Sequence, residues 1–345
     1  MSPTSEPRLS RDRIEALFAK MASSRVVVVG DAMLDIYLAG EAERISPEAP
    51  VPVVTVQGRR HALGGAANVA TNVAAIGGEA RLVAVIGDDP RSDSLRSELA
   101  AHHLTDRHLV TEPARPTTSK TRVMARGQQV VRIDEEVDEP VTARTEQLLT
   151  AELERAMVDA DALLIEDYNK GTLTTVVIDC AMSLARRRGV PVVVDPKFKN
   201  FFAYRGASVF KPNRRELEQA LGASVDLERA GALPSTLERL GVDNLLLTLG
   251  ADGMVLVTKD QEITRIPAMA REVFDVSGAG DTVTAWLGTA LAAGAAVREA
   301  AQIANYAAGV EVGKSGVATA SPAEVLAVHD ASHDQLGRLR RGGLL

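Results

Sequence analysis

The sequence predicts an α/β fold, in which helices cover both faces of a central, mostly parallel β-sheet and a small β-sheet lid lies beside it. Short apolar runs alternate with amphipathic stretches of helical length, which is typical of parallel strands joined by helical crossovers. Segments 37–57 and 116–135 interrupt this rhythm, because their residues alternate like surface strands around Gly turns. These two segments are the expected lid, built of antiparallel strands.

The expected strands of the main sheet are residues 25–30, 81–86, 162–165, 190–194 and 245–249. The expected helices are residues 66–76, 90–102, 142–158, 174–188 and 214–221. A further helix is expected at about residues 10–22. Because right-handed crossovers bring ligands to the carboxyl ends of parallel strands, the residues just after each strand are the candidates for chemistry.

Length and composition favour one large globular body. With 345 residues, of which 46% are hydrophobic, the chain can bury a large core without disulfides or metals. We expect one domain over residues 25–328, preceded by an N-terminal extension of residues 1–24. Residues 1–10 and 329–345 are polar or rich in Gly and Arg, so we expect mobile tails there.

Charge and cysteine content exclude several classes of protein. The net charge of −7 disfavours a nucleic-acid partner. The single cysteine, Cys180, excludes a disulfide framework and a metal site with several cysteine ligands, and it fits a reducing compartment. No apolar run approaches the roughly 18–20 residues of a membrane span, and no secretory signal precedes the first strand. We therefore expect a cytoplasmic protein that does not bind membranes.

The strongest motif is the segment Asp275–Thr282, Asp-Val-Ser-Gly-Ala-Gly-Asp-Thr, which opens a helical stretch that ends near Ala293. Its glycines let the backbone approach a ligand closely, and the amide N–H groups of a first helical turn attract an anion. A carboxylate at Asp281, beside a bound phosphoryl group, is explained if it takes a proton from an attacking hydroxyl. The alternative is an ordinary Gly turn in which Asp281 only favours the start of a helix.

On this segment the sequence resembles the ribokinase/PfkB family of sugar kinases. Two more family segments occur in the family's order, Gly30–Asp35 at the end of the first strand and Gly64–Ala70 ahead of a helix. The resemblance covers residues 24–327 and implies a three-layer αβα domain with a β-sheet lid. It also implies ATP as the phosphate donor, Mg²⁺, and a homodimer joined through the lid.

The resemblance implies roles for single residues. Asp281 matches the catalytic base, and Gly278, Ala279 and Gly280 match the hole that stabilises charge on the transferred phosphoryl group. The implied sugar-binding residues are Asp35, Gly64, Gly65 and Asn68. The implied nucleotide-side residues are Asn213, Glu216, Thr248, Gly250, Gly253, Asn305 and Gly309.

Cation sites are implied at two places. Asn213 and Glu216 match an Asn-x-x-Glu element that handles Mg²⁺ through water, although the same spacing also fits a capping box at a helix start. Asp275 and Ser277 resemble part of a site for a monovalent cation such as K⁺. For the small residues near Gly309, helix packing is the alternative explanation.

Within the family, segments 30–37 and 44–53 are most similar to the heptose 7-phosphate kinases. That resemblance implies transfer of phosphate to the anomeric oxygen of D-glycero-β-D-manno-heptose 7-phosphate, in the ADP-heptose pathway for lipopolysaccharide core. Bifunctional relatives add a nucleotidyltransferase domain with a His-x-Gly-His signature, which this sequence lacks, so we expect the kinase alone. The alternatives are a kinase for another sugar or sugar phosphate, and a non-catalytic sugar sensor on the same scaffold.

A phosphorylated sugar needs cations in the protein. Lys197 follows an expected strand and is the first candidate, because ligands gather at strand ends. Arg44, Lys120 and Arg122 lie on the expected lid strands and are further candidates, while a solvated surface charge is the alternative for each. Glu166 also follows a strand on the ligand edge, where some relatives have a small residue.

Overall fold

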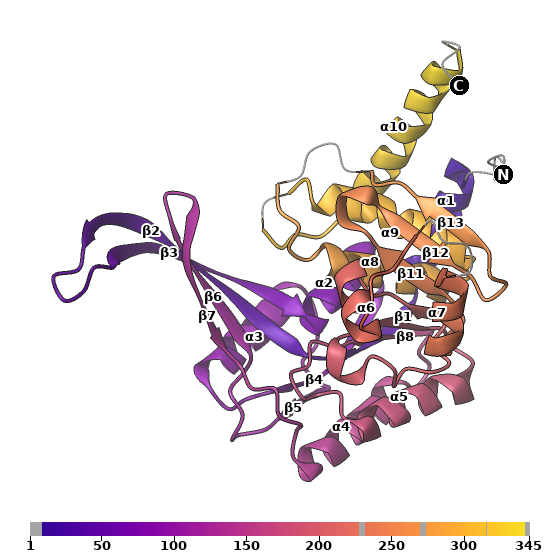
Figure 1. The fold of residues 1–345 in the computed structure, drawn as a ribbon. Coiled ribbons are helices and arrows are strands. Elements are labelled where there is room, and N and C mark those ends of the chain that lie inside the picture. Colours follow the sequence, from indigo (N-terminus) through magenta and orange to yellow (C-terminus); the bar gives the residue numbers. More distant parts are fainter. Residues whose placement is uncertain (1–8, 228–231, 270–273, 315, 342–345) are drawn as a thin grey trace.

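The computed structural model describes residues 9–227, 232–269, 274–314 and 316–341. In these residues a nine-stranded sheet lies between two layers of helices (Figure 1). Its strands, in spatial order, are β13 (Ile263–Ile266), β12 (Met254–Val257), β11 (Leu245–Thr248), β10 (Val209–Phe210), β9 (Val192–Asp195), β8 (Ala162–Glu166), β1 (Arg25–Gly30), β4 (Glu79–Ile86) and β5 (Leu109–Thr111). Neighbours pair in parallel except around β12, which is antiparallel to both β11 and β13.

The helices divide between the two faces of this sheet because successive strand side chains point to opposite sides. In β1, Val26 and Val28 pack into one core, and Val27 and Val29 into the other. The first core is covered by α1 (Arg11–Met21), α2 (Ala66–Ile76), α3 (Pro90–Ala101), α8 (Ala279–Ala292), α9 (Val297–Glu311) and α10 (Pro322–Arg341). The second is covered by α4 (Ala143–Ala156), α5 (Thr175–Arg188), α6 (Arg214–Leu221) and α7 (Ala232–Leu240). Short 3₁₀ turns are η1 (Phe198–Asn200) and η2 (Gly250–Asp252).

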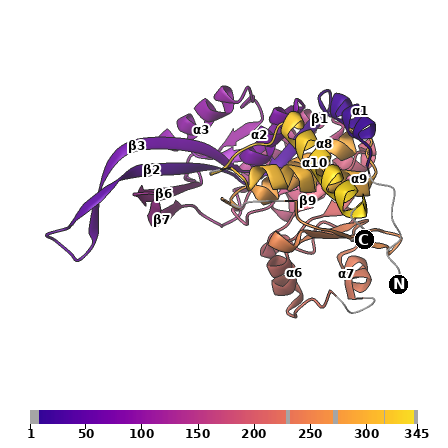
Figure 2. The ribbon, with the colours of Figure 1, turned by 90° about the horizontal axis from the view of Figure 1, so that it is seen from above.

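The predicted lid is a separate four-stranded sheet that projects from the main body (Figure 2). Its strands, in spatial order, are β3 (Pro52–Gly65), β2 (Ala32–Ile45), β6 (Ser119–Ala125) and β7 (Gln128–Glu135). The hairpins β2–β3 and β6–β7 are antiparallel as expected, but the central pair β2–β6 is parallel. The reason is that both hairpins leave the main sheet at its carboxyl edge, so their first strands run outward in the same direction.

The segment from residue 329, expected as a mobile tail, is helical in the described residues. Helix α10 continues through Arg341, and its first turns are held by burial of Val325 and His329. The His329 ring contacts the backbone carbonyl of Leu9 at 3.0 Å, which ties the two ends of the described chain together. Residues 1–8 and 342–345, also expected as tails, lie outside the described residues.

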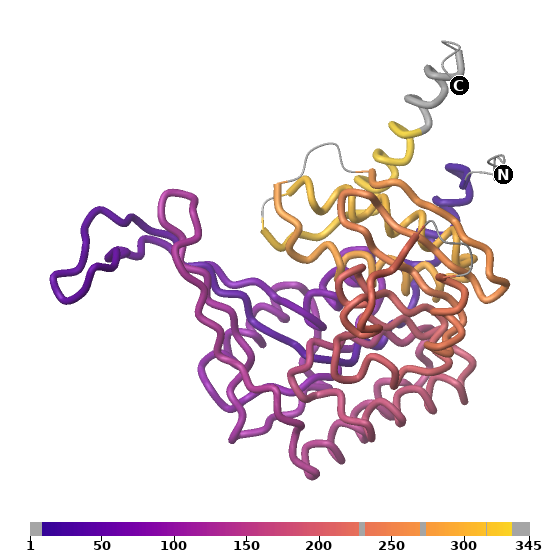
Figure 3. The backbone as a smooth tube through the Cα atoms, viewed as in Figure 1, coloured from indigo at the N-terminus to yellow at the C-terminus, as the bar shows by residue number. Residues whose placement is uncertain are grey.

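The N-terminal segment forms the predicted helix and joins the core. In α1, Ile14, Leu17 and Met21 are fully buried. The Phe18 ring meets the Trp286 ring of α8 edge-on, with 5.6 Å between centroids. Helices α1 and α10 lie next to each other on the same face (Figure 3). No helix among the described residues is both long enough and apolar enough to span a membrane.

Because Leu17 is fully buried, Leu17→Ala should lower the free energy of unfolding by about 2–5 kcal/mol, through lost apolar burial and a residual cavity. Urea unfolding followed by circular dichroism measures this change. Glu15→Ala, on the exposed side of the same helix, is the control and should leave stability nearly unchanged. Equal effects of both changes would contradict a structural role for α1.

Candidate active site

A cavity of about 460 Å³ opens at the carboxyl ends of β9, β10 and β11, next to the start of α8. All residues predicted for the nucleotide side line it, namely Asn213, Glu216, Thr248, Gly250, Gly253, Asn305 and Gly309. The loop residues Gly278, Ala279, Gly280 and Asp281 line it as well. The fold therefore gathers residues that lie up to about 100 positions apart in the sequence into one concave surface.

The first turn of α8 lines this cavity. Gly278 precedes the helix with φ +95°, a left-handed conformation that favours glycine. A Cβ at Gly278 would lie 3.1 Å from the Asn68 amide nitrogen and 3.3 Å from a Glu311 carboxylate oxygen. No side chain caps the helix, so its first N–H groups and the helix dipole are available to an anion.

Asp281 lies in this first turn and is only 4% exposed. Its Oδ2 accepts a hydrogen bond from the Asn68 side-chain amide at 2.7 Å, and its Oδ1 accepts one from the Tyr168 hydroxyl at 2.9 Å. Burial raises the pKa of Asp281 to about 6, although the bonds from Asn68 and Tyr168 oppose the shift. Near neutral pH the group is therefore a carboxylate that is ready to accept a proton.

Two more buried carboxylates lie behind Asp281. Carboxylate oxygens of Glu166, Asp195 and Asp281 lie within 4.8 Å of one another. Asp195 accepts a hydrogen bond from the buried Lys211 ammonium at 2.8 Å, whereas neither carboxylate oxygen of the fully buried Glu166 has a hydrogen-bond partner among the described residues. Burial, reinforced by Asp195, raises the pKa of Glu166 well above its usual range, which favours its protonated form.

Lys197 and Glu216 form an ion pair on the nucleotide side of the cavity. The Lys197 ammonium also lies 5.0 Å from the centre of the Tyr168 ring. Although burial opposes its charge, Asp195 and Glu216 raise the pKa of Lys197. Glu216 also closes the capping box, because its other oxygen accepts the Asn213 N–H at 2.8 Å. The structure thus places Lys197 against a predicted nucleotide residue.

The predicted sugar-side residues lie where the lid joins the body. Asp35 forms an ion pair with Arg122 of the neighbouring lid strand. A Cβ at Gly64 would lie 2.8 Å from an Asp35 carboxylate oxygen, and a Cβ at Gly65 would lie 2.4 Å from a backbone carbonyl oxygen. Gly64 therefore leaves room for the Asp35 side chain, and Gly65 for the close approach of the Asp31 backbone. Arg44 is exposed near the outer end of β2, far along the lid from this junction.

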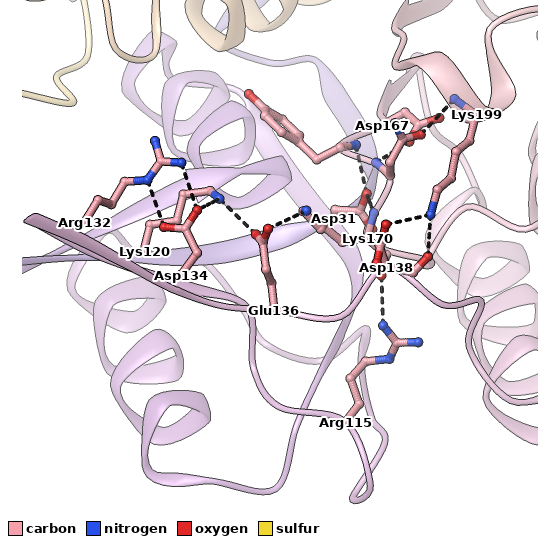
Figure 4. A network of polar contacts seen from close by, with 12 residues as sticks. Asp31, Arg115, Lys120, Arg132, Asp134, Glu136, Asp138, Asp167, Lys170 and Lys199 are labelled. Carbon is pink, nitrogen blue, oxygen red and sulfur yellow. Dashed lines mark hydrogen bonds and ion pairs between the residues drawn. The ribbon is translucent and has the colours of Figure 1, made fainter.

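An ionic network fixes the base of the lid to the loop that carries Tyr168 (Figure 4). The Lys120 ammonium bonds Asp134 at 3.2 Å and Glu136 at 2.9 Å, so this cation is already neutralised. Glu136 also bonds Lys170, at 2.7 Å. The backbone N–H groups of residues 168 and 170 donate to the Asp31 carboxylate at 2.8 and 2.9 Å. This network positions the loop from which the Tyr168 hydroxyl reaches Asp281.

The predicted monovalent-cation residues adjoin a buried acid. The Asp275 carboxylate accepts the Ser277 N–H at 2.9 Å. Nearby, Glu311 is fully buried, and among the described residues neither of its carboxylate oxygens has a hydrogen-bond partner. Burial, together with the charges of Asp275 and Asp281, raises the pKa of Glu311 to about 8.

Comparison with known proteins shows the family to which the chain belongs. The model of the pfkB family carbohydrate kinases matches residues 23–324. The chain belongs to this family. The bifunctional protein HldE of Trichlorobacter lovleyi is 42% identical over 327 residues, which cover 94% of this chain and 67% of that protein. HldE of Pelobacter propionicus is 41% identical over 340 residues, 98% of this chain and 70% of that protein.

Solved structures share the fold. Arabidopsis thaliana ribokinase complexed with ribose and ATP has a TM-score of 0.70 and 20% identity, over 89% of this chain and 98% of that one. Escherichia coli phosphofructokinase-2 in complex with fructose-6-phosphate has a TM-score of 0.71 and 16% identity, over 90% of this chain and 98% of that one. The protein is thus a ribokinase-like carbohydrate kinase with a lid, as its sequence predicts.

Several residues of this candidate site were not among those predicted. Tyr168, Asp195 and Lys211 all line the cavity. All three carry a usable signal, since each stands at or just after the end of a strand. The hydrogen bond of Tyr168 with Asp281 carries none, because it spans 113 positions.

Tyr168→Phe removes one hydrogen bond that favours the charged form of Asp281. We expect the pKa of Asp281 to rise above about 6, so the acid limb of kcat/KM moves to higher pH while activity at alkaline pH is largely retained. ADP formation measured from pH 5 to 9 checks this. Tyr204→Phe, which removes a buried phenol bonded to Asp167 instead, is the matched control. An unmoved acid limb in Tyr168→Phe would contradict the assignment.

Proposed function

We propose that this kinase transfers the terminal phosphate of ATP to the anomeric C1 hydroxyl of D-glycero-β-D-manno-heptose 7-phosphate, giving the 1,7-bisphosphate. The observation that carries the proposal is the buried Asp281 carboxylate, set in the amide-rich first turn of α8 at the edge of a large cavity. The heptose substrate is supported by the resemblance of segments 30–37 and 44–53 and by the HldE relatives. The product would then enter the ADP-heptose pathway for lipopolysaccharide core, in the cytoplasm.

ATP would lie along the nucleotide side of the cavity. Gly250, Gly253 and Gly309 have no side chains to project into this side of the cavity, which leaves room for a flat base and a ribose. The terminal phosphate would rest on the amides of Gly278–Gly280, where the helix dipole favours negative charge. Lys197 and Lys211 line the same cavity and balance phosphate charge.

The residues present fit Mg²⁺ held through water. Lys197 and the Asn213 N–H already engage the Glu216 carboxylate oxygens, so a contact through a water molecule suits this group better than a direct bond. Bound Mg²⁺ supplies neutralisation of the phosphate oxygens. A monovalent cation such as K⁺ suits Asp275 and Ser277, because the Asp275 carboxylate supplies negative charge there.

The protein's own residues then account for proton transfer. Asp281 accepts the proton of the anomeric hydroxyl while Asn68 and Tyr168 hold its carboxylate in place. Asp35 accepts a hydrogen bond from another sugar hydroxyl beside the space left by Gly64 and Gly65. The lid covers the sugar and excludes water that would compete as acceptor. Positioning and charge neutralisation supply most of the acceleration, since phosphoryl transfer needs little covalent help.

Asp281→Asn should reduce kcat by about 10²–10⁴-fold, because the amide cannot accept the proton. Calorimetric titration should show ATP and sugar binding within a few-fold of the unaltered enzyme. Asp260→Asn, in an exposed turn, is the control and should retain full activity. Near-normal turnover by Asp281→Asn would refute the assigned role.

An acceptor panel tests the substrate. With ATP and Mg²⁺ held constant, heptose 7-phosphate should give the highest kcat/KM among heptose 7-phosphate, fructose phosphates, ribose and nucleosides. Preference for an unphosphorylated sugar would replace the heptose assignment with another pfkB acceptor. Ligand binding without ADP formation from any acceptor would favour the non-catalytic sensor.

The lid carries the proposed homodimer contact. Val131 and Ile133 lie on the lid face opposite Lys120 and Arg122 and are 47% and 49% exposed. Such an apolar face on a projecting sheet is suited to packing against the same face of a second copy.

The double change Val131→Asp and Ile133→Asp should convert a dimer to a monomer, because it places charges in the apolar contact. Light scattering coupled to size-exclusion chromatography measures the mass. Gln129→Asp, on the same strand, is the control. A mass that the double change does not alter, or a monomeric unaltered protein, would contradict a lid-mediated dimer.

A further inference from the structure

Three side chains form a row across the lid face that carries Asp35. Arg60 of β3 and Arg122 of β6 are the cross-strand neighbours of Tyr37 in β2, so all three project from the same face of the sheet. The guanidinium carbons of Arg60 and Arg122 lie 4.4 and 5.3 Å from the centre of the Tyr37 ring. The electron-rich ring thus holds two cations close together, which would otherwise repel each other.

The charges of this row are not balanced. Arg122 pairs with Asp35, but within the part of the chain that the structure describes Arg60 has no carboxylate partner, and it is exposed. Of the other candidate cations, Lys120 pairs with Asp134 and Glu136, Lys197 pairs with Glu216, and Arg44 lies near the outer end of β2, far along the lid from Asp35. The row is therefore the place on the sugar side where an incoming anion finds uncommitted positive charge.

The row also faces the body of the protein. A Cβ on Gly316 would lie 2.7 Å from an Arg60 guanidinium nitrogen, so the side chain reaches from the lid to the segment after α9. The charge of Asp275, which precedes the α8 loop, acts on Tyr37 as well. Arg60 thus lies between the lid and the segment after α9.

We propose that Arg60 and Arg122, both held against the Tyr37 ring, bind the phosphate group of the sugar phosphate substrate. This inference rests on the proposed function and names the recognition subsite within it. A guanidinium group donates two parallel hydrogen bonds to phosphate oxygens, and two such groups match a dianion. A phosphate at Arg122 also draws this cation from Asp35, which leaves the Asp35 carboxylate able to accept a sugar hydroxyl.

The test is steady-state kinetics of Arg60→Gln, with heptose 7-phosphate and the unphosphorylated heptose as acceptors. We expect the KM for heptose 7-phosphate to rise about 10- to 100-fold, with kcat and the KM for ATP within about 3-fold of the unaltered enzyme. Kinetics with the unphosphorylated heptose should not change. Arg60→Lys should recover part of the lost affinity, because a lysine supplies the charge without the paired hydrogen bonds.

Arg59→Gln is the matched control, since it removes the same charge from the next position of β3, which faces the other side of the lid. Equal KM values in the Arg59 and Arg60 variants would overturn the subsite. If the unaltered enzyme prefers another sugar phosphate and Arg60→Gln loses that preference, only the heptose assignment fails. If it uses heptose 7-phosphate and Arg60→Gln leaves the KM unchanged, only the subsite fails. Preference of the unaltered enzyme for an unphosphorylated sugar overturns both.

Discussion

The candidate site centres on one buried carboxylate at the start of a helix. Asp281 is removed from water, yet two hydrogen bonds from distant parts of the chain favour its charged form. Asn68 comes from the helix that follows the lid hairpin, and Tyr168 from the loop after β8. Any movement of the lid or of this loop should therefore change the pKa of Asp281, because the pKa depends on these two hydrogen bonds.

Local patterns were sufficient for much of the fold. The boundaries of helices 66–76 and 214–221 agree with the structure, since a left-handed glycine ends each of them. The short strands β5, β12 and β13 had no distinct signal, because three or four residues do not establish a period. Helix α10 was missed because burial of His329 against the N-terminal segment is a long-range contact.

The candidate site divides in the same way. The glycine loop before Asp281 and the residues predicted for the nucleotide side of the cavity could be found from the sequence, since each carries a motif and stands at a strand or helix end. The ion-pair partners of the lysines and arginines could not be predicted from the sequence. Lys197 could be placed at an edge of the sheet from the sequence, but its pairing with Glu216 depends on how α6 docks. Arg60 differs from Arg59 only by the face of the lid on which it lies, and strand register decides that face.

The contact between Phe18 and Trp286 makes tryptophan fluorescence a probe of the packing between α1 and α8. Trp286 is the single tryptophan of the chain, is fully buried, and belongs to the helix whose first turn holds Asp281. Its indole is surrounded by apolar groups and by the ring from the N-terminal helix. The intrinsic tryptophan emission of the protein therefore comes from the same helix as Asp281, and a red shift would signal that water has entered between that helix and α1.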